Sequence, residues 1–128
     1  MSKMKKIFKF IPYLFVFTIL GNFKLVVISG NSMLPTLPNG SYAVVDTNLY
    51  KLFEINKGNI MLFKINQEEV VKKIIGFPNE KIDIEGNEIT IGDDEVFIIG
   101  ENPNESIDSR SYGPVNKRQI LGKVVLNF

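Results

Sequence analysis

Ser32 lies in a segment whose residue types could support nucleophilic chemistry. The segment from Ser29 to Pro38 reads SGNSMLPTLP. Serine, glycine, asparagine and proline are ordinary loop formers, so a simple connecting loop explains most of this composition. Gly30, however, permits a backbone turn that can aim an N–H group, and Ser32 follows it closely. Three apolar side chains come next, which is unusual in a solvated loop, and we expect them to pack on the domain, on a peptide or on a membrane: Met33, Leu34 and Leu37.

Two adjacent lysines in a run of β-branched residues are candidates for a general base. Lys72 and Lys73 stand within VVKKIIG. Side chains of a strand alternate between its faces, so one of the two lysines must point toward whatever the apolar side covers. Burial lowers the pKa of a lysine, and a neutral amine can accept a proton. Alternatively, both ammonium groups reach solvent along their apolar stems. The alternation does not choose between the two lysines.

A third segment, Gly100–Gly113, combines hydroxyl, carboxylate and guanidinium groups. Its sequence is GENPNESIDSRSYG, and the plainest interpretation is a long polar loop. Asp108 stands two residues before Arg110, one of only two arginines in the chain, and a local ion pair between them would order the backbone. Ser106 and Ser109 could supply hydroxyls that orient a neighbouring amine. Ordered loops on a β scaffold are common places for function.

The composition excludes several kinds of chemistry. The 128 residues include no cysteine and no histidine, so disulfides, thiol nucleophiles, thiolate or imidazole metal sites and a Ser-His-Asp triad are impossible. Any base must be lysine, aspartate, glutamate or tyrosine. The formal net charge is +1, and without a basic excess we expect no nucleic-acid partner.

Most of the chain has the pattern of an all-β domain. Short apolar runs alternate with turn residues, and Glu85-Gly86-Asn87 has the composition of a tight hairpin turn. A helical period occurs only around Asn48–Ile55. We therefore predict a small, folded, antiparallel β-barrel-like domain over residues 29–128. Its predicted strands are Tyr42–Asp46, Ile60–Ile65, Val70–Ile75, Lys81–Ile84, Glu88–Ile91, Val96–Ile99 and Ile120–Leu126.

Residues 1–28 predict a membrane anchor. Four lysines precede an uncharged apolar run from Phe10 to Leu20, and the wider stretch Ile7–Ile28 would span about 30 Å as a helix. A cleavable signal peptide or a buried helix of a soluble domain would also be apolar, but no small-x-small cleavage site precedes Gly21. We predict a single transmembrane helix in the lipid bilayer of the cell membrane. The lysines place its N-terminus in the cytoplasm and the rest of the chain outside.

Together these segments resemble the type I signal peptidase family, the serine/lysine-dyad leader peptidases that remove signal peptides from exported proteins. The resemblance follows the family's order over nearly the whole chain: an anchor, then the three boxes SGNSMLPTL, VKKIIGFPNE and GENPNESIDSRSYG. KGNIMLF, at Lys57–Phe63, also resembles a short Gly-Asp-Ile-Val-type strand of the family. The short length is similar to the compact Gram-positive type.

The resemblance implies a role for each matching residue. Ser32 matches the nucleophile, Lys72 the general base, and Ser106 the serine whose hydroxyl holds the lysine amine. Gly30 matches a contributor to the oxyanion hole, beside the backbone N–H of Ser32. The remaining matches are a structural ion pair, Asp108 with Arg110, and two substrate-binding residues, Met33 and Pro35. The resemblance implies no metal or other cofactor.

The resemblance also sets the expected function. We expect a membrane-anchored serine endopeptidase that cleaves preprotein signal peptides after small side chains. Glu101 stands where the family has Asp, Asn79-Glu80 where it has Gly-Asp, and Asn59 where it has Asp. None of these positions transfers a proton, so we expect activity to survive. The alternatives are a non-proteolytic relative that assembles surface proteins such as pilins, and a Ser/Lys peptidase dedicated to one substrate.

Overall fold

The computed structural model describes residues 21–128, which form a mainly β structure. Nine strands are joined by turns and by four short helical segments, of which only α2 (Ser109–Tyr112) is an α-helix. The three 3-10 helices are η1 (Leu49–Leu52), η2 (Pro103–Glu105) and η3 (Lys117–Gln119). The strands are β1 (Phe23–Val27), β2 (Tyr42–Asp46), β3 (Ile60–Ile65), β4 (Glu68–Gly76), β5 (Lys81–Ile84), β6 (Asn87–Thr90), β7 (Glu95–Ile99), β8 (Val115–Asn116) and β9 (Ile120–Asn127).

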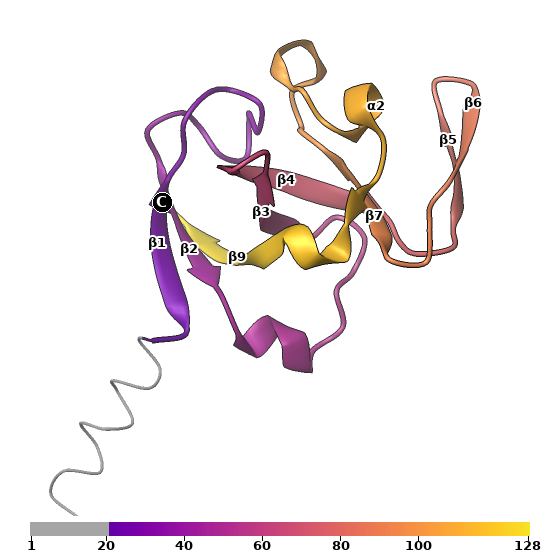
Figure 1. The fold of residues 1–128 in the computed structure, drawn as a ribbon. Helices are drawn as coiled ribbons and strands as arrows, with labels where there is room; N and C mark the ends of the chain where they lie inside the picture. Colours follow the sequence, from indigo (N-terminus) through magenta and orange to yellow (C-terminus); the bar gives the residue numbers. More distant parts are fainter. Residues whose placement is uncertain (1–20) are drawn as a thin grey trace, which may run out of the picture.

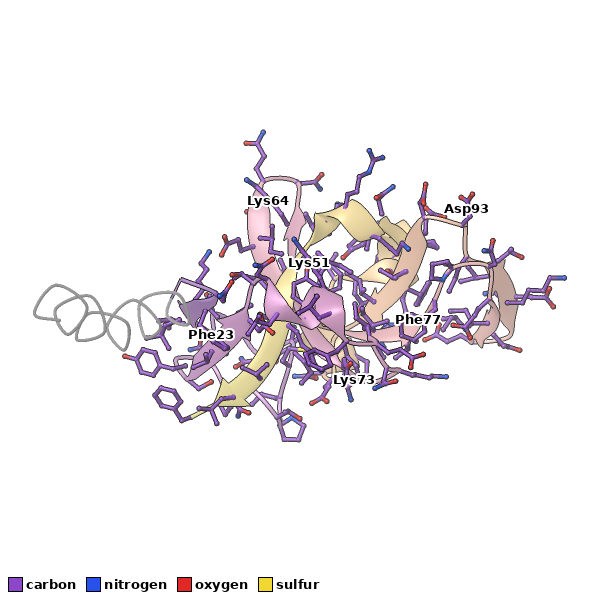
Figure 2. All side chains as sticks on the ribbon, turned by 90° about the horizontal axis from the view of Figure 1, so that it is seen from below. Phe23, Lys51, Lys64, Lys73, Phe77 and Asp93 are labelled. Carbon is purple, nitrogen blue, oxygen red and sulfur yellow. The ribbon has the colours of Figure 1, made fainter. Side chains whose placement is uncertain are left out.

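Seven strands form one antiparallel sheet in the order β1-β2-β9-β3-β4-β7-β8 (Figure 1). The other two form the separate hairpin β5–β6, which projects at the end of the molecule opposite Phe23 (Figure 2). The sheet is not closed into a barrel, so the barrel-like prediction is wrong on this point. Among the described strands β1 pairs only with β2, and β8 pairs only with β7, so no pairing joins the two ends of the sheet.

The strand predictions are confirmed for all seven predicted runs. Three agree at both ends, and the others differ by at most two residues at either end. The predicted hairpin turn is confirmed too, since Glu85 and Gly86 adopt φ angles of 53° and 84° between β5 and β6. The helical period near residue 50 corresponds to η1, a single 3-10 turn. These elements could be predicted because alternation and turn chemistry are local properties.

The strand β1 is a correction to the predicted anchor. Phe23–Val27 pairs with β2 from Phe23↔Asp46 to Val27↔Tyr42, so a helix reaching Ile28 is wrong over its last residues. An apolar run of this length is compatible with either a helix or a strand. Here the hydrogen bonds to β2 make it a strand. The remainder of the anchor prediction, on residues 1–20, lies outside the described residues. Within residues 21–128, no helix has the length and hydropathy needed to cross a membrane.

Two apolar clusters stabilise the sheet. The larger contains aromatic and aliphatic side chains from η1, β3, β4, β7 and β8: Tyr50, Met61, Phe63, Ile74, Val96, Ile98 and Val115. The smaller contains Ile28, Met33, Leu37 and Ala43, and it packs the loop after β1 onto the sheet. Met33 and Leu37 are 1% and 0% exposed, so these two of the three apolar side chains that follow Ser32 pack on the domain itself.

Candidate active site

The loop that carries Ser32 is closed at its base by backbone hydrogen bonds. The Ile28 N–H donates to the Ser41 carbonyl at 2.8 Å, and the Gly40 N–H donates to the Ile28 carbonyl at 2.7 Å. Gly30 has a φ of 89°, a left-handed conformation that favours glycine. Its N–H donates to Asn39 Oδ1 at 2.8 Å. Gly30 therefore shapes the turn before Ser32. Its N–H already has an acceptor in this geometry, whereas the resemblance implies that Gly30 contributes to the oxyanion hole.

A second loop holds the backbone of the Ser32 loop. The Asn102 N–H donates to the Ser32 carbonyl at 2.8 Å, and Asn102 Nδ2 donates to the Asn31 carbonyl at 3.1 Å. Gly100 lies so close that a Cβ on it would stand 2.7 Å from the Ser32 carbonyl oxygen and would overlap Ser106. The sequence did not single out Asn102, because this contact joins residues 70 positions apart and leaves no local pattern.

Lys72 is buried in β4, with 5% of its surface exposed. Its Nζ donates to Ser106 Oγ at 3.2 Å. Burial lowers the pKa of Lys72, the charge of Asp108 acts in the opposite direction, and Arg110 lowers it further. The amine therefore sits in surroundings that favour its neutral form, as a general base requires.

Lys73 lies in different surroundings on the same strand. Its Nζ is 2.6 Å from Glu101 Oε1. Burial by itself would raise the pKa of Glu101, but hydrogen bonds from Lys73 and from Thr36 lower it. The carboxylate thus links β4, the Ser32 loop and the loop after β7. The sequence missed this link, and its one signal was that Glu101 departs from the family pattern.

Asp108 is the centre of the hydrogen bonds behind Lys72. It is 0% exposed, and its Oδ2 accepts from Ser106 Oγ at 2.6 Å and from the Gly100 N–H at 2.8 Å. Arg110 donates to both carboxylate oxygens, from Nη2 at 2.6 Å and from Nε at 3.0 Å. Burial alone would raise the pKa of Asp108, but the hydrogen bonds from Arg110, Ser106 and Gly100 lower it to about 2.

The hydrogen bonds to Asp108 and from Lys72 set the orientation of the Ser106 hydroxyl. Because Asp108 has a low pKa, it is ionised near neutral pH and accepts a hydrogen bond from the Ser106 hydroxyl. The Ser106 oxygen is then left to accept from Lys72. The chain Lys72–Ser106–Asp108–Arg110 therefore holds the lysine amine in one position.

Ser32 and Lys72 line the same groove, whose volume is about 350 Å³. One wall is formed by the end of β1 and the Ser32 loop, and the other by the first half of β4. Gly30 and Met33 also line the groove. Four other predicted site residues do not line it: Ser106, Asp108, Arg110 and the exposed Pro35. The groove includes residues that the sequence did not single out: Val26, Val27, Leu62, Glu69, Glu105 and Ile107.

Comparison with known proteins identifies the class. The family described as signal peptidase, peptidase S26, matches residues 2–96 and 90–128 of the chain. Signal peptidase IB of Staphylococcus aureus is 26% identical over an alignment 143 positions long, which covers 79% of this chain and 75% of the staphylococcal protein. Mitochondrial inner membrane protease subunit 1 of Schizosaccharomyces pombe is 33% identical over 112 residues, 80% of this chain and 71% of the yeast protein.

The family match extends over the described β structure and both walls of the groove. The protein is therefore a serine endopeptidase. It belongs to the peptidase S26 family and is a type I signal peptidase, which confirms the resemblance seen in the three sequence boxes.

Proposed function

We propose that this peptidase removes signal peptides from exported proteins with Ser32 as nucleophile and Lys72 as general base. The observation that carries the proposal is the shared groove: Ser32 and Lys72 both line it, and burial lowers the pKa of the Lys72 amine. No histidine occurs in the chain, so another base must activate the serine. Lys72 is the buried amine of the groove.

The reaction begins when the neutral Lys72 amine takes the proton of Ser32 Oγ as that oxygen attacks the scissile carbonyl. The backbone N–H of Ser32 is the donor that we assign to the developing oxyanion, and one such donor lowers a barrier by about 3 kcal/mol. The Lys72 ammonium then protonates the leaving amine. A water molecule, deprotonated by Lys72, releases the acyl group from Ser32.

An extended substrate fits the edges of the groove. β1 is an edge strand, and β7 pairs with β4 only from Lys73 onward, so the first half of β4 also has an edge without a strand partner among the described residues. A peptide strand can form backbone hydrogen bonds with either edge. Met33, between the two edges, supplies an apolar floor with Val71. We propose that small substrate side chains face this floor next to the cleaved bond.

We further propose that residues 1–22 anchor the protein in the membrane and that residues 23–128 form the extracytoplasmic catalytic domain. The support is the apolar run Phe10–Leu20 after four lysines, and the start of β1 at Phe23. The yeast relative is named as an inner membrane protease. This boundary is earlier than the sequence predicted, because β1 belongs to the sheet.

The test compares cleavage of a preprotein, in detergent, by wild type, Ser32→Ala and Lys72→Met. We expect each substitution to reduce kcat by roughly 10³- to 10⁶-fold, because nucleophile and base act as a unit. Ser111→Ala and Lys64→Met are matched controls, since both side chains are exposed and neither lines the groove. Both controls should keep wild-type activity. Undiminished cleavage by Ser32→Ala or Lys72→Met would reject the dyad. Absence of cleavage by wild type, with assembly of surface proteins retained by Ser32→Ala, would favour the non-proteolytic alternative.

A further inference from the structure

An ion pair links the two strands that form the walls of the groove, and one of its members, Glu69, lines the groove itself. Lys24 Nζ, on β1, lies 2.6 Å from Glu69 Oε1, on β4. The two side chains are 45% and 42% exposed, so the pair stands in contact with solvent. It joins the two strands whose edges form the walls of the groove.

The two walls run in the same direction. Four successive antiparallel pairings connect them, β1 with β2, β2 with β9, β9 with β3 and β3 with β4. Both strands therefore begin at the ion pair and lead toward the reactive residues, β1 toward Ser32 and β4 toward Lys72. Glu69 precedes Lys72 by three residues, which is about 10 Å along a strand. A peptide strand of about four residues fills this length.

We propose that the Lys24–Glu69 pair is a specificity determinant that limits how many substrate residues on one side of the scissile bond the groove accepts. The inference rests on the proposed function of the groove. A longer extended segment must separate β1 from β4 at this point, and so must break the pair. Exposed ion pairs are weak, so the pair reduces the use of longer segments by only roughly two- to fivefold.

The experiment measures kcat/KM for three peptides: a core of three residues on each side of the bond, and the same core extended by four residues at its N- or C-terminal end. For one of the two extensions, the extended-to-core ratio should rise roughly two- to fivefold in Lys24→Gln and in Glu69→Gln. The exchanged variant Lys24→Glu/Glu69→Lys should restore the wild-type ratio. Wild type in 1 M salt should resemble the single variants, because salt screens an exposed pair.

The matched control is the exposed pair Lys81–Glu88 in the hairpin β5–β6, with 3.9 Å between its charged atoms. Lys81→Gln and Glu88→Gln should leave the ratio unchanged. Unchanged ratios for both extensions in the Lys24 and Glu69 variants, or an exchanged variant that behaves like the single ones, would overturn the inference. If wild type cleaves none of the peptides, the proposed function fails. The extended-to-core affinity ratio, measured by fluorescence anisotropy in the Ser32→Ala background, then still decides the inference.

Discussion

Lys72 and Lys73 are adjacent in the chain and identical in type, yet their surroundings differ. Lys72 is buried against Ser106, and Lys73 pairs with Glu101. The alternation of a strand separates the two side chains, but only the loop after β7 gives each its partner. The pKa of Lys72 is lowered mainly by burial, and its position depends on the carboxylate of Asp108 through Ser106.

The activity of the wild-type enzyme should rise with pH. The pKa of Lys72 lies below the ordinary value of 10.5, so the amine loses its proton at a lower pH than an exposed lysine does. The neutral amine is the active base, and kcat/KM should therefore increase through an inflection below pH 10.5. A pH–rate profile on the core peptide measures this. A profile that falls over the same range, with the protein still folded, would contradict a neutral lysine base.

The Asp108 carboxylate should stabilise the fold at neutral pH and not in acid. Its pKa falls from 3.8 to about 2 on folding, so its contribution is present above pH 4 and is lost as the pH falls through 2. The shift corresponds to about 2 kcal/mol. Urea unfolding should show that the difference in unfolding free energy between wild type and Asp108→Asn shrinks by that amount between pH 6 and pH 2. A difference independent of pH would contradict the assignment.

At the scale of the elements, three segments that are far apart in sequence lie together around Ser32. The Ser32 loop, the strand β4 and the loop after β7 are tied together by Asn102, by Ser106 and by the Lys73–Glu101 pair. Gly100, directly after β7, allows a close approach of these segments, because a side chain there would overlap Ser106 and the Ser32 carbonyl. The position of the Ser32 loop relative to Lys72 therefore depends on contacts between elements.

Gly100→Ala should separate these elements. The added Cβ meets backbone as well as side-chain atoms, so the loops must shift. We expect the unfolding free energy to fall by about 1–3 kcal/mol, the usual cost of inserting an extra carbon into a well-packed region. Activity should fall more than about tenfold, because small misplacements of reacting groups are costly. Peptide cleavage and thermal unfolding measure the two effects. Asn104→Ala, at an exposed position of the same loop, is the control. Wild-type activity in Gly100→Ala would show that the close approach is dispensable.

At the scale of the whole molecule, the open sheet creates the groove. A closed barrel would pair the edges of its strands with one another, whereas here the edge of β1 and the free part of the β4 edge both line a groove of about 350 Å³. The sheet carries both apolar clusters, and all their members lie within residues 26–124. Both apolar clusters of the described residues thus belong to the β structure that forms the groove.

Removal of residues 1–20 should leave a folded enzyme. We expect kcat/KM on the soluble core peptide to stay within about threefold of wild type, because both apolar clusters and the groove are built from residues within 21–128. Processing of a preprotein in liposomes should fall further, since the proposed anchor no longer concentrates the enzyme at the membrane. Circular dichroism checks the fold, and the two cleavage assays check the activities. An equal loss in both assays would contradict a purely anchoring role.

The sequence by itself determined seven of the nine described strands, all but β1 and β8, and the candidate residues. Alternating β-branched residues and turn residues are local signals, and they placed β2, β3 and β5 to the residue. The three boxes then identified the family and, by resemblance, chose Lys72 over Lys73. Only the tertiary structure decided that Phe23–Val27 joins the sheet, that the sheet stays open, and that Asn102 and Glu101 hold the Ser32 loop. The reason is that strand pairing and burial depend on contacts between residues far apart in the chain, which no local pattern records.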